Sequence, residues 1–110
     1  MIDIIEKIGL PAVMEQLAEE CSELAQVALK KSRILRGENP TPCTSDDINL
    51  KLSEEVADVF NCLDILGYMP VHNEIGLVDI IRKNKLCRWE ERLKNYQKTS
   101  CVIKQEHENE

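Results

Sequence analysis

Two segments of this chain repeat one pattern of acidic and apolar residues. They are L-A-E-E-C-S-E-L at residues 17–24 and L-S-E-E-V-A-D-V at residues 52–59. Residues three apart share one face of a helix, so Glu20 pairs with Glu23 and Glu55 pairs with Asp58. If the apolar faces of the two helices pack together, four carboxylates meet at the rim of one core and repel each other unless cations neutralise them. The repeat therefore predicts a divalent-metal site, and its all-oxygen ligands favour Mg²⁺, with Mn²⁺ as a substitute.

Acidic residues on a helix usually face solvent, and three features weigh against that interpretation here. The acids border the apolar stripe instead of lying opposite it, and the arrangement occurs twice in the same phase. Lysines are scarce at the i+4 positions, where Leu24 follows Glu20 and Val27 follows Glu23. Two alternatives stay open: a non-enzymatic helical module whose acidic face binds a basic partner, and a ferritin-like di-metal protein. The latter normally uses Glu-x-x-His pairs, which neither segment contains.

Four helical segments are expected to position these acids. A short amphipathic helix is expected over residues 2–8, ended by Gly9, and a second helix runs from Pro11 to about Arg36, before Gly37. A third helix, capped by Ser45 or Asp46, runs to about residue 66, and a fourth spans about residues 73–96. No strand pattern of useful length occurs. The sequence predicts an all-α fold of three main helices and a short N-terminal helix, with a single domain over residues 1–97 and a polar, frayed tail over residues 98–110.

Composition narrows the class of protein. A chain of 110 residues forms one domain with a modest core, and a net charge of -6 argues against nucleic-acid binding through a broad basic surface. Apolar runs are too short to span a membrane and the N-terminus is no signal peptide, so we expect a cytoplasmic protein with no membrane partner. The five cysteines include no C-x-x-C pair and are expected to be reduced core residues. Aromatic residues make up 4%, so the small core is expected to gain stability from a partner subunit.

The two acidic segments together resemble a known signature. Glu19-Glu20-Cys21-Ser22-Glu23, followed by Glu55-Val56-Ala57-Asp58, is similar to the EExxE…ExxD motif of the MazG-like nucleotide pyrophosphohydrolases, in the all-α NTP pyrophosphatase superfamily. The resemblance covers about residues 10–95, although residues 24–54 separate the two acid pairs by somewhat more than the usual family spacing. It implies a helical-bundle fold that is completed by oligomerisation, in a homodimer or a homotetramer.

The resemblance also implies roles for individual acids. Glu20, Glu23, Glu55 and Asp58 would hold Mg²⁺, and Glu19 would be a further acid of the site. Glu19 or Glu20 would take a proton from the attacking water. The implied reaction is hydrolysis of a nucleoside triphosphate, NTP or dNTP, between its α and β phosphates to a monophosphate and pyrophosphate; the motifs do not identify the base.

A cluster of basic residues on the last predicted helix is the second candidate for chemistry. Arg82, Lys83, Lys85 and Arg88 surround Asn84 in a chain whose net charge is -6. Such a run alone is often a solvated face, but a nucleoside triphosphate needs cationic partners for its phosphates as well as a metal ion. The resemblance implies phosphate contacts on this helix, and the matching substrate-binding residues are Lys83, Asn84, Lys85 and Arg88.

Overall fold

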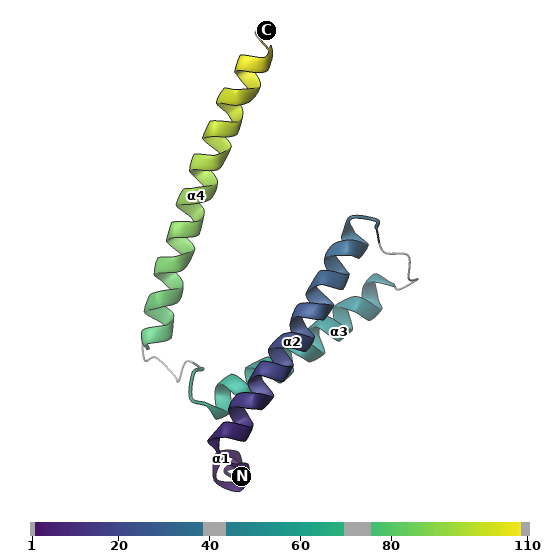
Figure 1. Cartoon of the computed structure of the whole chain (residues 1–110), viewed down its shortest axis with the longest axis vertical. Helices are drawn as coiled ribbons and strands as arrows, with labels where there is room; N and C mark the ends of the chain where they lie inside the picture. Colours follow the sequence, from purple (N-terminus) through teal and green to yellow (C-terminus); the bar gives the residue numbers. More distant parts are fainter. Residues whose placement is uncertain (1, 39–43, 70–75, 109–110) are drawn as a thin grey trace. The chain divides into compact units, whose positions relative to one another are not determined.

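All the regular secondary structure of the described residues is α-helical. The computed structural model describes residues 2–38, 44–69 and 76–108, with side chains as far as residue 96 (Figure 1). The helices are α1 (Ile4–Ile8), α2 (Leu10–Leu35), α3 (Ser45–Ile65) and α4 (Leu77–Glu108), and no strand occurs among these residues. The all-α class is therefore confirmed. The chain divides into two units, Met1–Met69 with α1 to α3 and Pro70–Glu110 with α4, and each unit is described by itself.

Local capping chemistry explains where the first two helices begin and end. The Asp3 carboxylate accepts a hydrogen bond of 3.1 Å from the backbone N–H of Glu6, which caps the start of α1. Gly9, at φ 91°, ends α1 in a conformation that other residues rarely adopt, and Pro11 lies in the first turn of α2. Gly37, at φ 72°, follows the end of α2. The end of α1 and both ends of α2 agree with the sequence prediction to within one residue, whereas α1 begins two residues later than predicted.

The N-terminal cap of α3 differs by one residue from the prediction. The Thr44 hydroxyl accepts a hydrogen bond of 3.1 Å from the backbone N–H of Asp47, so Thr44 is the cap and not Ser45 or Asp46. Thr, Ser and Asp all accept this bond well, and the sequence alone does not choose between adjacent candidates. The acidic pair Asp46 and Asp47 then lies in the first turn, where the positive end of the helix dipole stabilises it.

The last helix is longer than expected. The predicted start at Asn73 lies outside the described residues, and α4 is described from Leu77. Its backbone remains helical to Glu108, so the predicted end near Tyr96 is wrong. Residues 97–108 contain no glycine or proline that would stop a helix, and polarity alone was a poor stop signal. The domain boundary at residue 97 stays a prediction.

Helices α2 and α3 form a hairpin that holds the small core of the first unit (Figure 1). Its buried apolar side chains are Val13 and Val27 on α2 and Ile48, Val59 and Cys62 on α3. This core contains no aromatic side chain among the described residues. None of the described helices meets the length and hydropathy needed to cross a membrane.

Truncation of a core side chain should destabilise this hairpin. Ile48 is 3% exposed, and Ile48→Ala is expected to lower the free energy of unfolding by about 2–5 kcal/mol, because the change leaves a cavity between α2 and α3. Leu35, which is 76% exposed, is the matched control, and Leu35→Ala should cost about 0.5 kcal/mol or less. Urea unfolding followed by circular dichroism measures both. Equal losses would place Ile48 outside the core.

Candidate metal centre

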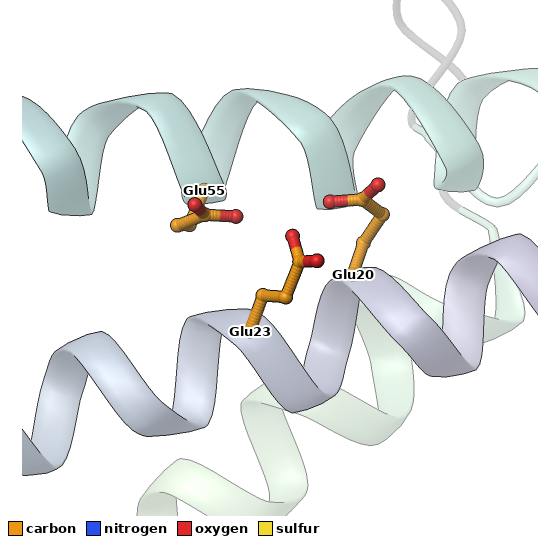
Figure 2. A group of neighbouring side chains, drawn as sticks. All are labelled: Glu20, Glu23 and Glu55. Carbon is orange, nitrogen blue, oxygen red and sulfur yellow. The ribbon is translucent and has the colours of Figure 1, made fainter.

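Three of the four predicted metal ligands converge between α2 and α3. Glu20 and Glu23 lie one turn apart on α2, and Glu55 faces them from α3 (Figure 2). Each contributes one carboxylate oxygen, and these oxygens lie within 4.8 Å of one another. We call these three residues the acid group. Their arrangement follows from the helical period on α2 and from the packing of the two apolar stripes.

Two members of the acid group each have one satisfied and one unsatisfied oxygen. In Glu20, Oε1 accepts a hydrogen bond of 2.6 Å from Gln16 Nε2. In Glu55, Oε1 lies 3.1 Å from Lys51 Nζ. The Oε2 atoms of Glu20 and Glu55 are both buried and have no hydrogen-bond partner among the described residues. Glu55 as a whole is only 4% exposed.

An unpartnered carboxylate oxygen in a buried place is costly unless a positive charge compensates it. The acid group offers two such oxygens beside a third carboxylate, and all of its donors are hard oxygen atoms. This donor set fits a hard divalent cation such as Mg²⁺ and offers no nitrogen or sulfur ligand for a softer one.

The carboxylates of the acid group are close enough to affect the pKa of Glu23. The negative charge of Glu20, partial desolvation and the negative charge of Glu55 together raise the pKa of Glu23 above its ordinary value of 4.5. Hydrogen bonds with Glu55 and Glu20 add to this shift, so the negative form of Glu23 is disfavoured in the absence of a cation.

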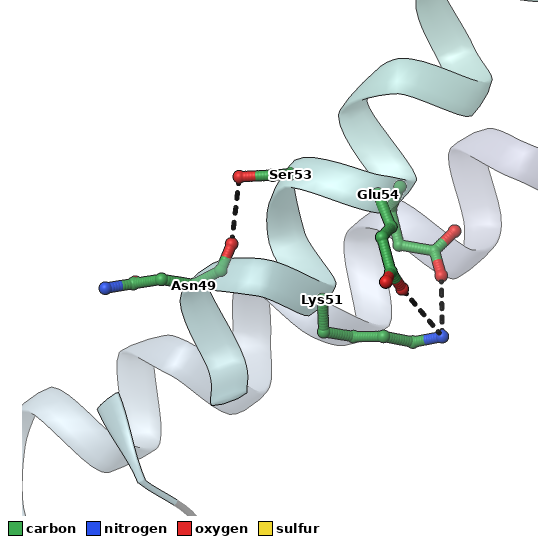
Figure 3. A network of polar contacts seen from close by, with 5 residues as sticks. Asn49, Lys51, Ser53 and Glu54 are labelled. Atoms are coloured by element: carbon green, nitrogen blue, oxygen red, sulfur yellow. Dashed lines mark hydrogen bonds and ion pairs between the residues drawn. The ribbon is translucent and has the colours of Figure 1, made fainter. Parts of the chain in front are cut away.

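Lys51 is a residue of this centre that the sequence analysis missed. Its Nζ lies 4.0 Å from Glu54 Oε2 (Figure 3). The same atom lies 3.1 Å from Glu55 Oε1. No lysine lies four residues after Glu20 or Glu23 on α2, whereas Lys51 lies four residues before Glu55 on α3. That i–4 spacing on a helix was the signal available in the sequence.

The other predicted acids lie outside the acid group. Glu19 and Asp58 are exposed, and the side chain of Glu54 is 56% exposed. Asp58 follows Glu55 by one turn, but its side chain is one methylene shorter than that of glutamate. The charge of Asp58 affects Cys62: burial, and then the charges of Glu20 and Asp58, raise the pKa of the Cys62 thiol. Asp58 as a fourth ligand and Glu19 as a further acid stay predictions.

The predicted phosphate-binding residues all lie on α4, in the second unit. They are Lys83, Asn84, Lys85 and Arg88, and all are exposed. Lys83 and Lys85 line one pocket beside Trp89, and Lys85 and Arg88 line another beside the same indole; Asn84 lines neither. Because the two units are described separately, a shared site between these residues and the acid group stays a prediction.

The free energy of unfolding should depend on pH because Glu23 ionises differently in the folded and unfolded protein. Its raised pKa makes the folded protein bind this proton more tightly than the unfolded chain does. The resulting stability is fully present below the ordinary value of 4.5 and is lost as the pH rises through the raised pKa of the folded state. In metal-free protein, Glu23→Gln is therefore expected to be more stable than wild type at pH 7, with a difference that shrinks toward pH 4.

Urea unfolding in EDTA at several pH values between 4 and 7 measures this difference. Glu15→Gln, an exposed acid on the same helix, is the control and should show no such trend. If the free energies of unfolding of Glu23→Gln and wild type differ by a constant amount over this pH range, the claim that neighbouring carboxylates repel Glu23 is contradicted.

Comparison of the chain with protein-family models, with curated proteins and with solved structures finds no match. The resemblance to the MazG-like enzymes therefore rests on the two acidic motifs.

Proposed function

We propose that this protein is a Mg²⁺-dependent nucleoside triphosphate pyrophosphohydrolase of the MazG-like type. It hydrolyses an NTP or dNTP between the α and β phosphates and releases a nucleoside monophosphate and pyrophosphate. One observation carries the proposal: Glu20, Glu23 and Glu55 converge from two helices, and two of their buried oxygens have no partner among the described residues.

The acid group would hold the ion, with Asp58 as a proposed fourth ligand and Mn²⁺ as a substitute metal. An ion bound there would neutralise negative charge on the phosphate oxygens and would lower the pKa of a bound water molecule. The exposed residues Lys83, Asn84, Lys85 and Arg88 on α4 are the proposed partners of the phosphates. Cationic and amide donors of this kind position a polyphosphate and stabilise its charge during displacement.

The chemical step needs an acceptor for one proton. The oxygen of a water molecule forms a new bond to the α phosphorus, while the bond from that phosphorus to the α–β bridging oxygen breaks and pyrophosphate leaves. Of the two predicted proton acceptors, Glu20 belongs to the acid group and has an unpartnered oxygen, whereas Glu19 is exposed outside it. These positions favour Glu20 as the acceptor.

Oligomerisation is part of the same proposal. The hairpin exposes several large apolar side chains, namely Leu10, Met14, Leu29, Leu50 and Phe60. A homodimer or homotetramer that completes a helical bundle would cover such surface, and we place this assembly in the cytoplasm with its nucleotide substrates. Size-exclusion chromatography with light scattering measures the assembly, and a monomer at micromolar concentration would contradict it.

A panel of nucleotides tests the activity. The full-length protein is incubated with each NTP and dNTP in the presence of Mg²⁺, and the products are separated by ion-exchange chromatography. We expect at least one nucleotide to give monophosphate and pyrophosphate in equal amounts, and EDTA to stop the reaction. Orthophosphate as the product would show that another bond is cleaved. Absence of cleavage across the panel would favour the alternative, an acidic helical module that binds a basic partner.

A further inference from the structure

A second feature of the α2–α3 hairpin adjoins the acid group. A pocket of about 390 Å³ is lined from α2 by Gln26, Val27 and Lys30 and from α3 by Asp47, Ile48 and Lys51. Gln26 follows Glu23 by three residues and Lys51 precedes Glu55 by four, so the pocket begins one helical turn, about 5.4 Å, from the acid group. Both features are built from the same two helices.

The charges in this pocket suit an anion. Lys30 is half-buried, and it makes no ion pair or hydrogen bond with the residues that the structure describes. Lys51 supplies a second positive charge, which Glu55 and Glu54 offset in the metal-free protein. Asp47 is the only carboxylate among the lining residues. Gln26 adds an amide that can donate further hydrogen bonds.

Lys51 connects the pocket to the acid group. It lines the pocket, and its Nζ contacts Glu55 Oε1 at 3.1 Å. Its side chain is 56% exposed, so the ammonium group can change partners without disturbing the core. A divalent cation in the acid group would take over the neutralisation of Glu55 and weaken the hold of that carboxylate on Lys51.

We propose that this pocket is a phosphate subsite, in which Lys30 and Lys51 bind the part of the polyphosphate chain that lies beyond the metal ion. Lys51 is an exchangeable counter-ion: it pairs with Glu55 in the metal-free protein and with a phosphate group when the divalent ion and the substrate are bound. The inference rests on the proposed function. It gives the phosphate groups a second set of positively charged partners, which lies in the hairpin, in addition to the residues of α4.

Two titrations of the full-length protein test the inference. Isothermal titration calorimetry measures the binding of Mg²⁺ alone and then of inorganic pyrophosphate at saturating Mg²⁺. Lys30→Gln is expected to weaken pyrophosphate binding about tenfold or more and to leave Mg²⁺ binding unchanged. Lys51→Gln is expected to weaken pyrophosphate binding to a similar degree and to strengthen the binding of Mg²⁺ alone, because a competing cation is removed.

Lys7→Gln is the matched control, since Lys7 is exposed on α1 and lies outside the pocket; it should behave as wild type. Retained Mg²⁺ binding shows that a variant is folded. If both Lys30→Gln and Lys51→Gln bind pyrophosphate with wild-type affinity, the subsite is overturned and the metal centre is left intact. The same conclusion follows if the wild-type protein binds Mg²⁺ but does not bind pyrophosphate. A wild-type protein that binds no Mg²⁺ would overturn the metal centre and the subsite together.

Discussion

Glu55→Gln is expected to lower the rate of nucleoside triphosphate hydrolysis by at least about a hundredfold. Glu55 is 4% exposed, and its Oε2 is one of the two buried oxygens without a partner among the described residues. Glutamine keeps nearly the same shape but removes the negative charge that would hold the ion. The loss should therefore appear at all substrate concentrations and should be only partly restored by excess Mg²⁺.

The adjacent acid provides the control for this variant. The side chain of Glu54 is 56% exposed and lies outside the acid group, so Glu54→Gln is expected to retain activity within about twofold. Initial rates of pyrophosphate release, measured for both variants under identical conditions, give the comparison. Similar losses in Glu54→Gln and Glu55→Gln would show that general negative charge on α3, and not the acid group, supports the reaction.

Mg²⁺ is expected to stabilise the wild-type protein by about 2.7 kcal/mol at a concentration one hundred times its dissociation constant. In the proposed function, the ion binds where the three carboxylates are brought together, and it would offset the repulsion that raises the pKa of Glu23. Glu20→Gln deletes the charge that contributes most to this shift and also removes one ligand. We expect its stabilisation at the same Mg²⁺ concentration to be less than half that of wild type.

Urea unfolding with and without Mg²⁺ measures this linkage, with NaCl added to hold the ionic strength constant. Glu15→Gln, on the exposed part of the same helix, should keep the full effect. If Mg²⁺ raises the free energy of unfolding equally in wild type and Glu20→Gln, the ion acts elsewhere on this acidic protein.

The acid group was predictable because helical geometry relates spacing to direction. Glu20 and Glu23 share a face at a separation of three residues, and the apolar stripe beside them indicated which face would meet α3. The placement of Glu55 opposite them followed from the repeated pattern. The sequence did not predict in the same way which side chains would extend far enough to join the group. Asp58 occupies the position in the repeat that corresponds to Glu23, but it is exposed and lies outside the group.

Neutralisation of the acids was predicted less well than their convergence. The absence of lysines at i+4 from Glu20 and Glu23 was correct as a statement about α2, but Lys51 reaches Glu55 from the preceding turn of α3. Likewise, glycines marked the ends of α1 and α2, whereas the end of α4 had no such signal in residues 97–108. Positive stop signals were informative in this chain, and polarity was not.

Diffraction from crystals grown with Mn²⁺ tests the metal centre most directly, because the anomalous signal of manganese locates the ion without reference to activity. We expect an anomalous peak within coordination distance of carboxylate oxygens of Glu20, Glu23 and Glu55, and no such peak in Glu55→Gln. A map of the wild-type protein with no peak at the acid group, at a Mn²⁺ concentration that supports hydrolysis, would contradict the proposed metal centre.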